Sequence, residues 1–182
     1  MSGPTPTCLT KSPLNKTRLV IGVDPGSRVT GYGLVLAGQD GRLACLACGQ
    51  IRPPEASPLP LKLWVVYQGL TEVLDSQRPE EMAVEDVFLS RNARSALALG
   101  QVRGVALLAA ASRGLKVYTY NSKAIKKSVV GYGQAAKEQV GRMVRVMLGL
   151  SEELGEDVSD ALACAICHLH TSATLNRLEV GA

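Results

Sequence analysis

Short apolar runs alternate along this chain with longer segments that have helical periodicity. Residues 18–24 (RLVIGVD) are rich in β-branched side chains and end at Pro25-Gly26, as is typical of a buried strand stopped by a turn. The pair Asp40-Gly41 favours a tight hairpin between the next two apolar runs. The same criteria predict strands at 18–24, 32–37, 43–51, 82–88 and 115–120, and helices at 61–74, 92–112, 122–130, 135–148 and 157–175.

This order of elements predicts an α/β fold in which helices flank a mixed five-stranded sheet. The first three strands form an antiparallel meander, and the fourth follows a helical crossover, so we expect it to run parallel beside the first. We expect a single domain over residues 18–176. Residues 1–17 are rich in Pro, Ser and Thr and predict a flexible N-terminal extension, and residues 177–182 a short C-terminal tail.

The predicted helix at 92–112 is apolar on nearly every side. A helix of this kind is buried on more than one face. Two interpretations stay open: the helix is enclosed within one domain, or it packs on the sheet with one face and against a second subunit with another.

Composition limits the class of protein. The chain has 182 residues, of which 46% are hydrophobic and 20% charged, which suits an ordinary folded domain. It has no apolar run of about 18 residues and no apolar centre of a signal peptide near its start, so we expect a cytoplasmic protein without membrane contact.

Five cysteines raise the question of zinc. Cys45-x-x-Cys48 falls on a predicted strand, where positions three apart face opposite sides. Cys164-x-x-Cys167, followed by His168 and His170, falls within a helix rich in Ala and Leu. We therefore favour buried, reduced thiols over metal ligands.

The net charge of +4 conceals an asymmetry. Residues 91–145 carry eleven Lys and Arg but only one acidic residue, a balance of +10, so the rest of the chain sums to −6. A contiguous basic segment of this strength is typical of proteins that bind a polyanion, although solvated helix faces can give a similar count.

Four acidic residues are placed where they could converge. Asp24 ends the first strand, Glu85 lies inside the fourth, and Asp157 and Asp160 open the last helix on one side of its first turn. A turn role for Asp24 and capping roles for the two helix residues are open alternatives. Glu85 is harder to explain, because a carboxylate in an apolar strand is costly unless it is paired or bound to metal. Asp86 faces the other side of the pleat, so only one of the two can serve this site.

Hard divalent cations such as Mg²⁺ and Mn²⁺ prefer oxygen ligands. Two such ions held by carboxylates can activate water and stabilise the departing oxygen of a phosphodiester. Four convergent carboxylates on an otherwise basic protein therefore predict a phosphate-cleaving site. We expect Asp24 to bridge the two metals.

Several segments, in order along the chain, resemble the RuvC family of bacterial Holliday-junction resolvases, the crossover junction endodeoxyribonucleases. The resemblance implies a ribonuclease H-like fold, a homodimer, and metal-dependent nicking of two opposed strands of a four-way DNA junction, which would leave 5′-phosphate and 3′-hydroxyl ends. It also implies partners of the RuvA and RuvB branch-migration type. The segments are 20–33 (VIGVDPGSRVTGYG), 83–93 (AVEDVFLSRNA), 99–104 (LGQVRG), 129–137 (VVGYGQAAK) and 157–163 (DVSDALA).

The resemblance also assigns residues. It places Asp24, Glu85, Asp157 and Asp160 at the family's four acidic positions, and so selects Glu85 over Asp86.

Contacts with DNA are expected from the basic segment and from the only Phe of the chain. By resemblance, Phe88 stacks on an unpaired base near the junction centre, although a core position is the usual one for Phe. The basic residues expected to contact phosphates are Lys126 and Lys137, by resemblance, and Arg91, Arg94 and Lys127, by charge and proximity.

Two other functions compete with this interpretation. Asp24-x-Gly26 followed by Gly31 also suits the phosphate-binding hairpin of a sugar-kinase or actin-like ATP-binding protein, but such proteins need two lobes and this chain is too short. The other is a junction-binding protein without catalysis, in which the carboxylates are structural caps.

Overall fold

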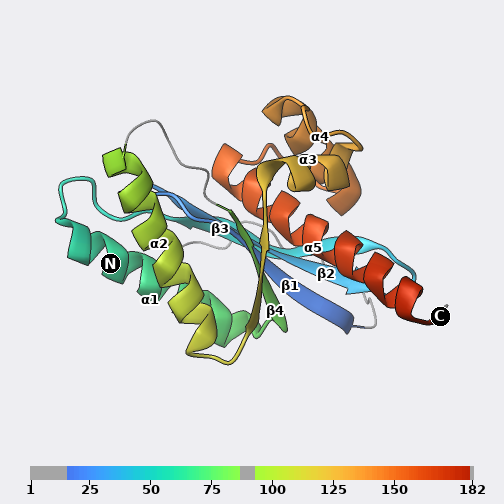
Figure 1. The fold of residues 1–182 in the computed structure, drawn as a ribbon, viewed down its shortest axis with the longest axis horizontal. Helices are drawn as coiled ribbons and strands as arrows, with labels where there is room; N and C mark the ends of the chain where they lie inside the picture. Colours follow the sequence, from blue (N-terminus) through green and yellow to red (C-terminus); the bar gives the residue numbers. More distant parts are fainter. Residues whose placement is uncertain (1–15, 87–92, 181–182) are drawn as a thin grey trace.

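In the computed structural model, residues 16–86 and 93–180 are described, and they form one sheet between two layers of helices (Figure 1). The α/β class and the order of elements predicted from the sequence are confirmed. The strands are β1 (Lys16–Asp24), β2 (Thr30–Gly38), β3 (Leu43–Ile51), β4 (Glu81–Glu85) and β5 (Lys116–Tyr120). The helices are α1 (Leu59–Gln77), α2 (Ala93–Ala111), α3 (Ser122–Val130), α4 (Lys137–Leu148) and α5 (Glu156–Val180). The domain limits of 18 and 176 stay predictions.

The sheet has the strand order β3-β2-β1-β4-β5. β1, β2 and β3 form the antiparallel meander, and β4 pairs with β1 in parallel, as the helical crossover through α1 requires. β5 continues the parallel half beside β4. The chain therefore brings the carboxyl ends of β1 and β4 side by side.

Helices cover both faces of this sheet (Figure 1). α1 and α2 pack on one face, where Leu70 and Ala106 join Ile21 of β1 in a buried cluster. α5 crosses the other face with α3 and α4 beside it, and Ile166 packs there with Val20 of β1. Successive residues of β1 thus point to opposite layers, as the pleat of a strand requires.

Two glycines let α5 lie unusually close to the sheet. A Cβ atom on Gly22 of β1 would come within 1.9 Å of the carbonyl oxygen of Ala161, and one on Gly31 of β2 within 2.0 Å of that of Asp157. Any side chain at these positions would force the helix away. The first turns of α5 therefore rest directly on β1 and β2.

Two predictions about strands are wrong. The fourth strand was expected to run to residue 88 with Glu85 inside it, but Glu85 is the last residue of β4 and Asp86 is no longer in the strand, while 87 and 88 lie outside the described residues. Cys45 and Cys48 do not face opposite sides: a register shift in the β2–β3 pairing leaves Leu46 as an extra residue, and both thiols enter the same buried cluster. Both are nonetheless buried and free of disulfides, as predicted.

Helix α2 buries one face in this chain and leaves another open. Val102, Ala106 and Ala109 are buried, whereas Leu97 is 65% exposed and Leu108 is 60% exposed. Enclosure of this helix within one domain is therefore wrong, and the interpretation with a second subunit stays open. Within the described residues, no helix is both long and apolar enough to cross a membrane.

Candidate active site

Asp24 and Glu85 end two adjacent parallel strands. Val23 of β1 pairs with Val84 of β4, so the two acidic residues follow at the same level of the sheet. Val23 and Val84 are buried in the α1–α2 layer. Because side chains alternate along a strand, Asp24 and Glu85 project into the opposite layer, toward α5.

The first turn of α5 supplies the other two acidic residues. Asp157 lies against Gly31, which is the partner of Asp24 in the β1–β2 ladder. Asp160 follows one turn later on the same side of the helix. The bare backbone of Gly31 is what allows this turn to approach the end of β1.

A cavity of about 310 Å³ lies at this end of the sheet, and three of the four predicted carboxylates line it. Asp157 is not among its lining residues but lies within electrostatic range of Asp24 and Asp160. The lining consists of Asp24, Pro25, Glu85, Asp86, Leu99, Ser122, Ile125, Lys126, Lys137, Val140 and Asp160.

The carboxylates raise one another's affinity for protons. Burial, followed by the charges of Glu85, Asp160 and Asp157, raises the pKa of Asp24 to about 7. Burial and neighbouring carboxylates likewise raise the pKa values of Glu85 and Asp160 above their usual range. Such a cluster of partly buried, mutually repelling acids is typical of a functional site, because a structural role would not need it.

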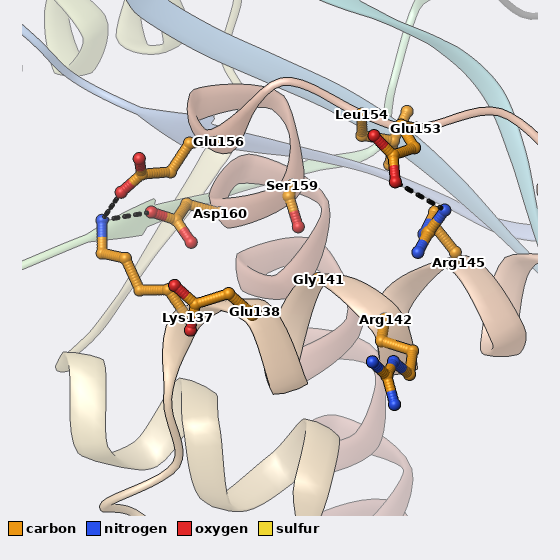
Figure 2. Close-up of a pocket in the computed structure, with 10 residues that line it drawn as sticks. All are labelled: Lys137, Glu138, Gly141, Arg142, Arg145, Glu153, Leu154, Glu156, Ser159 and Asp160. Carbon is orange, nitrogen blue, oxygen red and sulfur yellow. Dashed lines mark hydrogen bonds and ion pairs between the residues drawn. The ribbon is translucent and has the colours of Figure 1, made fainter.

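Lys137 at the start of α4 forms an ion pair with this cluster. Its ammonium lies 3.2 Å from Oδ2 of Asp160 and forms a second, shorter ion pair with Glu156, as Figure 2 shows. The hydrogen bond to Glu156 and the charge of Asp160 raise the pKa of Lys137 above its ordinary value. Lys137 and Asp160 also border a second cavity of about 330 Å³ between α4 and α5, which Arg142 and Arg145 line.

Asp157 has a partner that the sequence analysis missed. Gln50, next to the last residue of β3, donates a hydrogen bond from Nε2 to Oδ2 of Asp157 at 3.0 Å. Arg52 in turn donates to Oε1 of Gln50 from Nη2 at 2.6 Å and from Nε at 3.1 Å. Only the strand register could have revealed Gln50, because it pairs with Gly31 in the β2–β3 ladder.

The donor chemistry of this site suits a divalent cation of the Mg²⁺ class, because the acids offer hard oxygen ligands and carry uncompensated negative charge. Among residues 16–86 and 93–180, no three acidic, His or Cys side chains stand close enough together to hold a metal ion as they are.

The family model for the crossover junction endodeoxyribonuclease RuvC matches residues 20–168. The chain belongs to the RuvC family. RuvC of Koribacter versatilis is 49% identical over 164 residues, which cover 90% of this chain and 99% of the relative. The solved structure of RuvC from T. thermophilus in complex with Holliday junction substrate superposes with a TM-score of 0.82 at 33% identity, covering 87% of this chain and 96% of that one.

The ribonuclease H-like fold has a more distant counterpart in the yeast mitochondrial Holliday junction resolvase Ydc2. That structure matches with a TM-score of 0.65 at 15% identity over 91% of this chain, which shows the shared fold alone. As a RuvC family member, the protein is a crossover junction endodeoxyribonuclease, a metal-dependent enzyme that hydrolyses phosphodiester bonds in DNA. The ATP-binding and non-catalytic interpretations are not supported.

The predicted DNA contacts of this RuvC protein divide into three groups. Lys126 lines the cavity and donates from Nζ to the carbonyl oxygen of Ala135 at 2.7 Å, and Lys137 lies beside it. Lys127 is exposed on α3 and does not line the cavity. Arg94 is the second residue of α2, but its side chain lies outside the described residues, as do Phe88 and Arg91.

Proposed function

We propose that Asp24, Glu85, Asp157 and Asp160 together hold two divalent cations, Mg²⁺ or Mn²⁺, at which this endonuclease cleaves the DNA backbone. The observation that carries the proposal is the convergence of acids from three distant segments on one cavity, with the pKa of Asp24 raised to about 7. When bound, the cations would supply a more acidic water molecule and positive charge beside the departing oxygen.

The protein's own residues would position the cations and the DNA, and would compensate the charge of the phosphates. Asp24 sits between Glu85 of the neighbouring strand and the first turn of α5, which makes it the best placed of the four to bridge two ions. Lys126 and Lys137 border the same cavity and would bind phosphate oxygens on either side of the scissile bond. Lys137 would exchange Asp160 for a phosphate when metal and DNA bind.

The proposed substrate is a four-way DNA junction. The T. thermophilus relative is described in complex with Holliday junction substrate. Cleavage would leave 5′-phosphate and 3′-hydroxyl ends, and two opposed nicks require two active sites. We propose that a homodimer supplies them and that the open apolar side of α2, with Leu97 and Leu108, forms its interface.

The remaining contacts rest on resemblance and charge. We propose base stacking for Phe88 and phosphate contacts for Arg91, Arg94 and Lys127, which need only reach the DNA backbone to contribute. Partners of the RuvA and RuvB type, and a cytoplasmic location, stay predictions.

The test of the metal site uses Asp24→Asn. Purified protein is incubated with a labelled four-way junction, with and without Mn²⁺, and both binding and nicking are measured. We expect the variant to lose nicking but to bind the junction as well as the parent, because the basic surface is intact and one negative charge is gone. Asp40→Asn, in the exposed turn between β2 and β3, is the matched control.

Two outcomes would contradict the proposal. Nicking by Asp24→Asn at the parental rate would exclude Asp24 from the chemistry. Failure of the parent to cut branched DNA in any divalent metal would remove the carboxylates from a catalytic role.

A further inference from the structure

Asp24, Gly31 and Gln50 form one row across three neighbouring strands. Asp24 pairs with Gly31 in the β1–β2 ladder, and Gly31 pairs with Gln50 in the β2–β3 ladder. The start of α5 lies over the middle of this row, because Gly31 has no side chain to keep Asp157 away. Gln50 therefore reaches Asp157 from the side opposite Asp24.

The hydrogen bonds of Gln50 have a fixed direction. An arginine can only donate, so the two bonds from Arg52 hold Oε1 of Gln50 and leave its amide nitrogen as the group that faces Asp157. The amide nitrogen in turn can only donate, so Oδ2 of Asp157 must accept, at 3.0 Å. The contact thus engages only one of the two carboxylate oxygens of Asp157.

From this geometry we propose that Gln50 is a positioning residue, which holds Asp157 so that its second oxygen, Oδ1, is presented to a divalent cation in the active site. Asp157 needs such a partner more than the other acids do. Asp24, Glu85 and Asp160 line the cavity, whereas Asp157 does not line it and is partly exposed. Outer partners that orient a metal ligand are typically worth 10–100-fold in metal affinity.

The backbone around Gln50 is adapted to this contact. Gly155, two residues before Asp157, lies so close that a Cβ atom on it would come within 3.0 Å of Nε2 of Gln50. The amide therefore occupies a narrow space between the end of β3 and the start of α5. A longer or branched side chain at position 155 would displace it.

The proposal rests on the assignment of Asp157 as a metal ligand, so the experiment tests both. Mn²⁺ binding is measured by electron paramagnetic resonance on the full-length protein without DNA. The variants are Gln50→Leu, Asp157→Asn and the double variant, with Gln39→Leu, in the exposed turn at the other end of the β2–β3 hairpin, as the control. Thermal unfolding in EDTA verifies that each variant is folded.

We expect Gln50→Leu to weaken Mn²⁺ binding about tenfold. In the Asp157→Asn background the same change should have an effect of less than about twofold, because Gln50 acts through Asp157. Arg52→Ala should weaken binding by an intermediate factor, since the amide can then rotate. High Mn²⁺ concentration should restore nicking by Gln50→Leu.

The experiment distinguishes failure of the positioning role of Gln50 from failure of Asp157 as a metal ligand. Parental Mn²⁺ affinity in Gln50→Leu, combined with weakened affinity in Asp157→Asn, would overturn the positioning role and leave the metal site intact. An additive effect of the two changes would also overturn it. Unchanged affinity in Asp157→Asn would instead contradict the assignment of Asp157 as a ligand, and the positioning role would fall with it.

Discussion

The ammonium of Lys137 lies 3.2 Å from the carboxylate of Asp160, at the point where the catalytic cavity meets the cavity between α4 and α5. The ammonium of Lys137 thus supplies part of the positive charge that we propose the divalent metals provide. Its second ion pair, with Glu156, would keep it beside the site if Asp160 bound a metal instead. Lys137 is therefore placed to be passed from protein carboxylates to a DNA phosphate.

Replacement of Lys137 by Ala should weaken junction binding and make it less sensitive to salt. One lost phosphate contact reduces the slope of log affinity against log salt concentration by about 1. The measurement is junction binding in EDTA at several salt concentrations. Lys62→Ala, on α1 across the sheet, is the control and should leave the slope unchanged. An unchanged slope in Lys137→Ala would exclude the phosphate contact.

The metal-free protein should lose stability as the pH rises from about 4 to about 7. The pKa of Asp24 is about 7 in the folded protein, against an ordinary value of 3.8 for aspartate, so between these limits the folded state binds more protons than the unfolded one. The free energy of unfolding then falls with pH, by as much as a few kcal/mol from this group. Glu85 and Asp160 act in the same direction.

Urea unfolding in EDTA at pH 5, 6, 7 and 8 measures this slope, and Asp24→Asn isolates the part due to Asp24. The variant is needed because His168 acts in the opposite direction to Asp24. Burial lowers the pKa of His168, so its contribution to the free energy of unfolding increases as the pH rises toward 6.5. The variant should be the more stable protein at pH 8. Equal pH dependence in both proteins would show that Asp24 ionises freely.

The sequence predicted those parts of the site that follow from local periodicity and chain connection. Asp24 and Glu85 converge because a helical crossover makes β1 and β4 parallel neighbours, and both facts can be derived from the pattern of apolar residues. Gln50 could not be found in this way. Its contact with Asp157 joins residues 107 positions apart and depends on the register of two strand pairs and on the closeness of α5.

The errors have similar physical causes. The bulge at Leu46 is visible only in the register of β3 against β2, and no residue type near Cys45 marks it. β4 ends at Glu85, opposite the last residue of its neighbour β5, so the composition of residues 82–88 alone placed Glu85 too far inside the strand.

Gly31→Ala should move the acidic residues of α5 away from Asp24 and Glu85 at the strand ends. The added methyl group would meet the carbonyl oxygen of Asp157, so α5 must move away from β2. Overpacking of this kind costs about 1–3 kcal/mol, and the shift should also weaken Mn²⁺ binding. Gly100→Ala, where nothing lies within 4 Å, should instead stabilise α2 by about 0.5–1 kcal/mol. Parental stability and Mn²⁺ affinity in Gly31→Ala would contradict the close packing.

The open face of α2 gives the last prediction, which concerns the proposed dimer. In a symmetric interface each leucine of this face counts twice, and burial of one leucine contributes about 1.5–3 kcal/mol. Leu108→Glu should therefore weaken the dimer at least about a hundredfold, as sedimentation velocity at low micromolar protein would measure. Because Leu108 is 60% exposed in the single chain, the variant should fold as stably as the parent, within about 0.5 kcal/mol.

The nicking pattern follows from the same change. A monomer holds one active site, so Leu108→Glu should lose the paired cuts of opposed strands even where single nicks persist. Val146→Glu is the matched control, because Val146 is 70% exposed on α4, a helix on the other side of the sheet. If the Leu108→Glu protein sediments as a dimer and still cuts opposed strands in pairs, the dimer interface does not lie on α2.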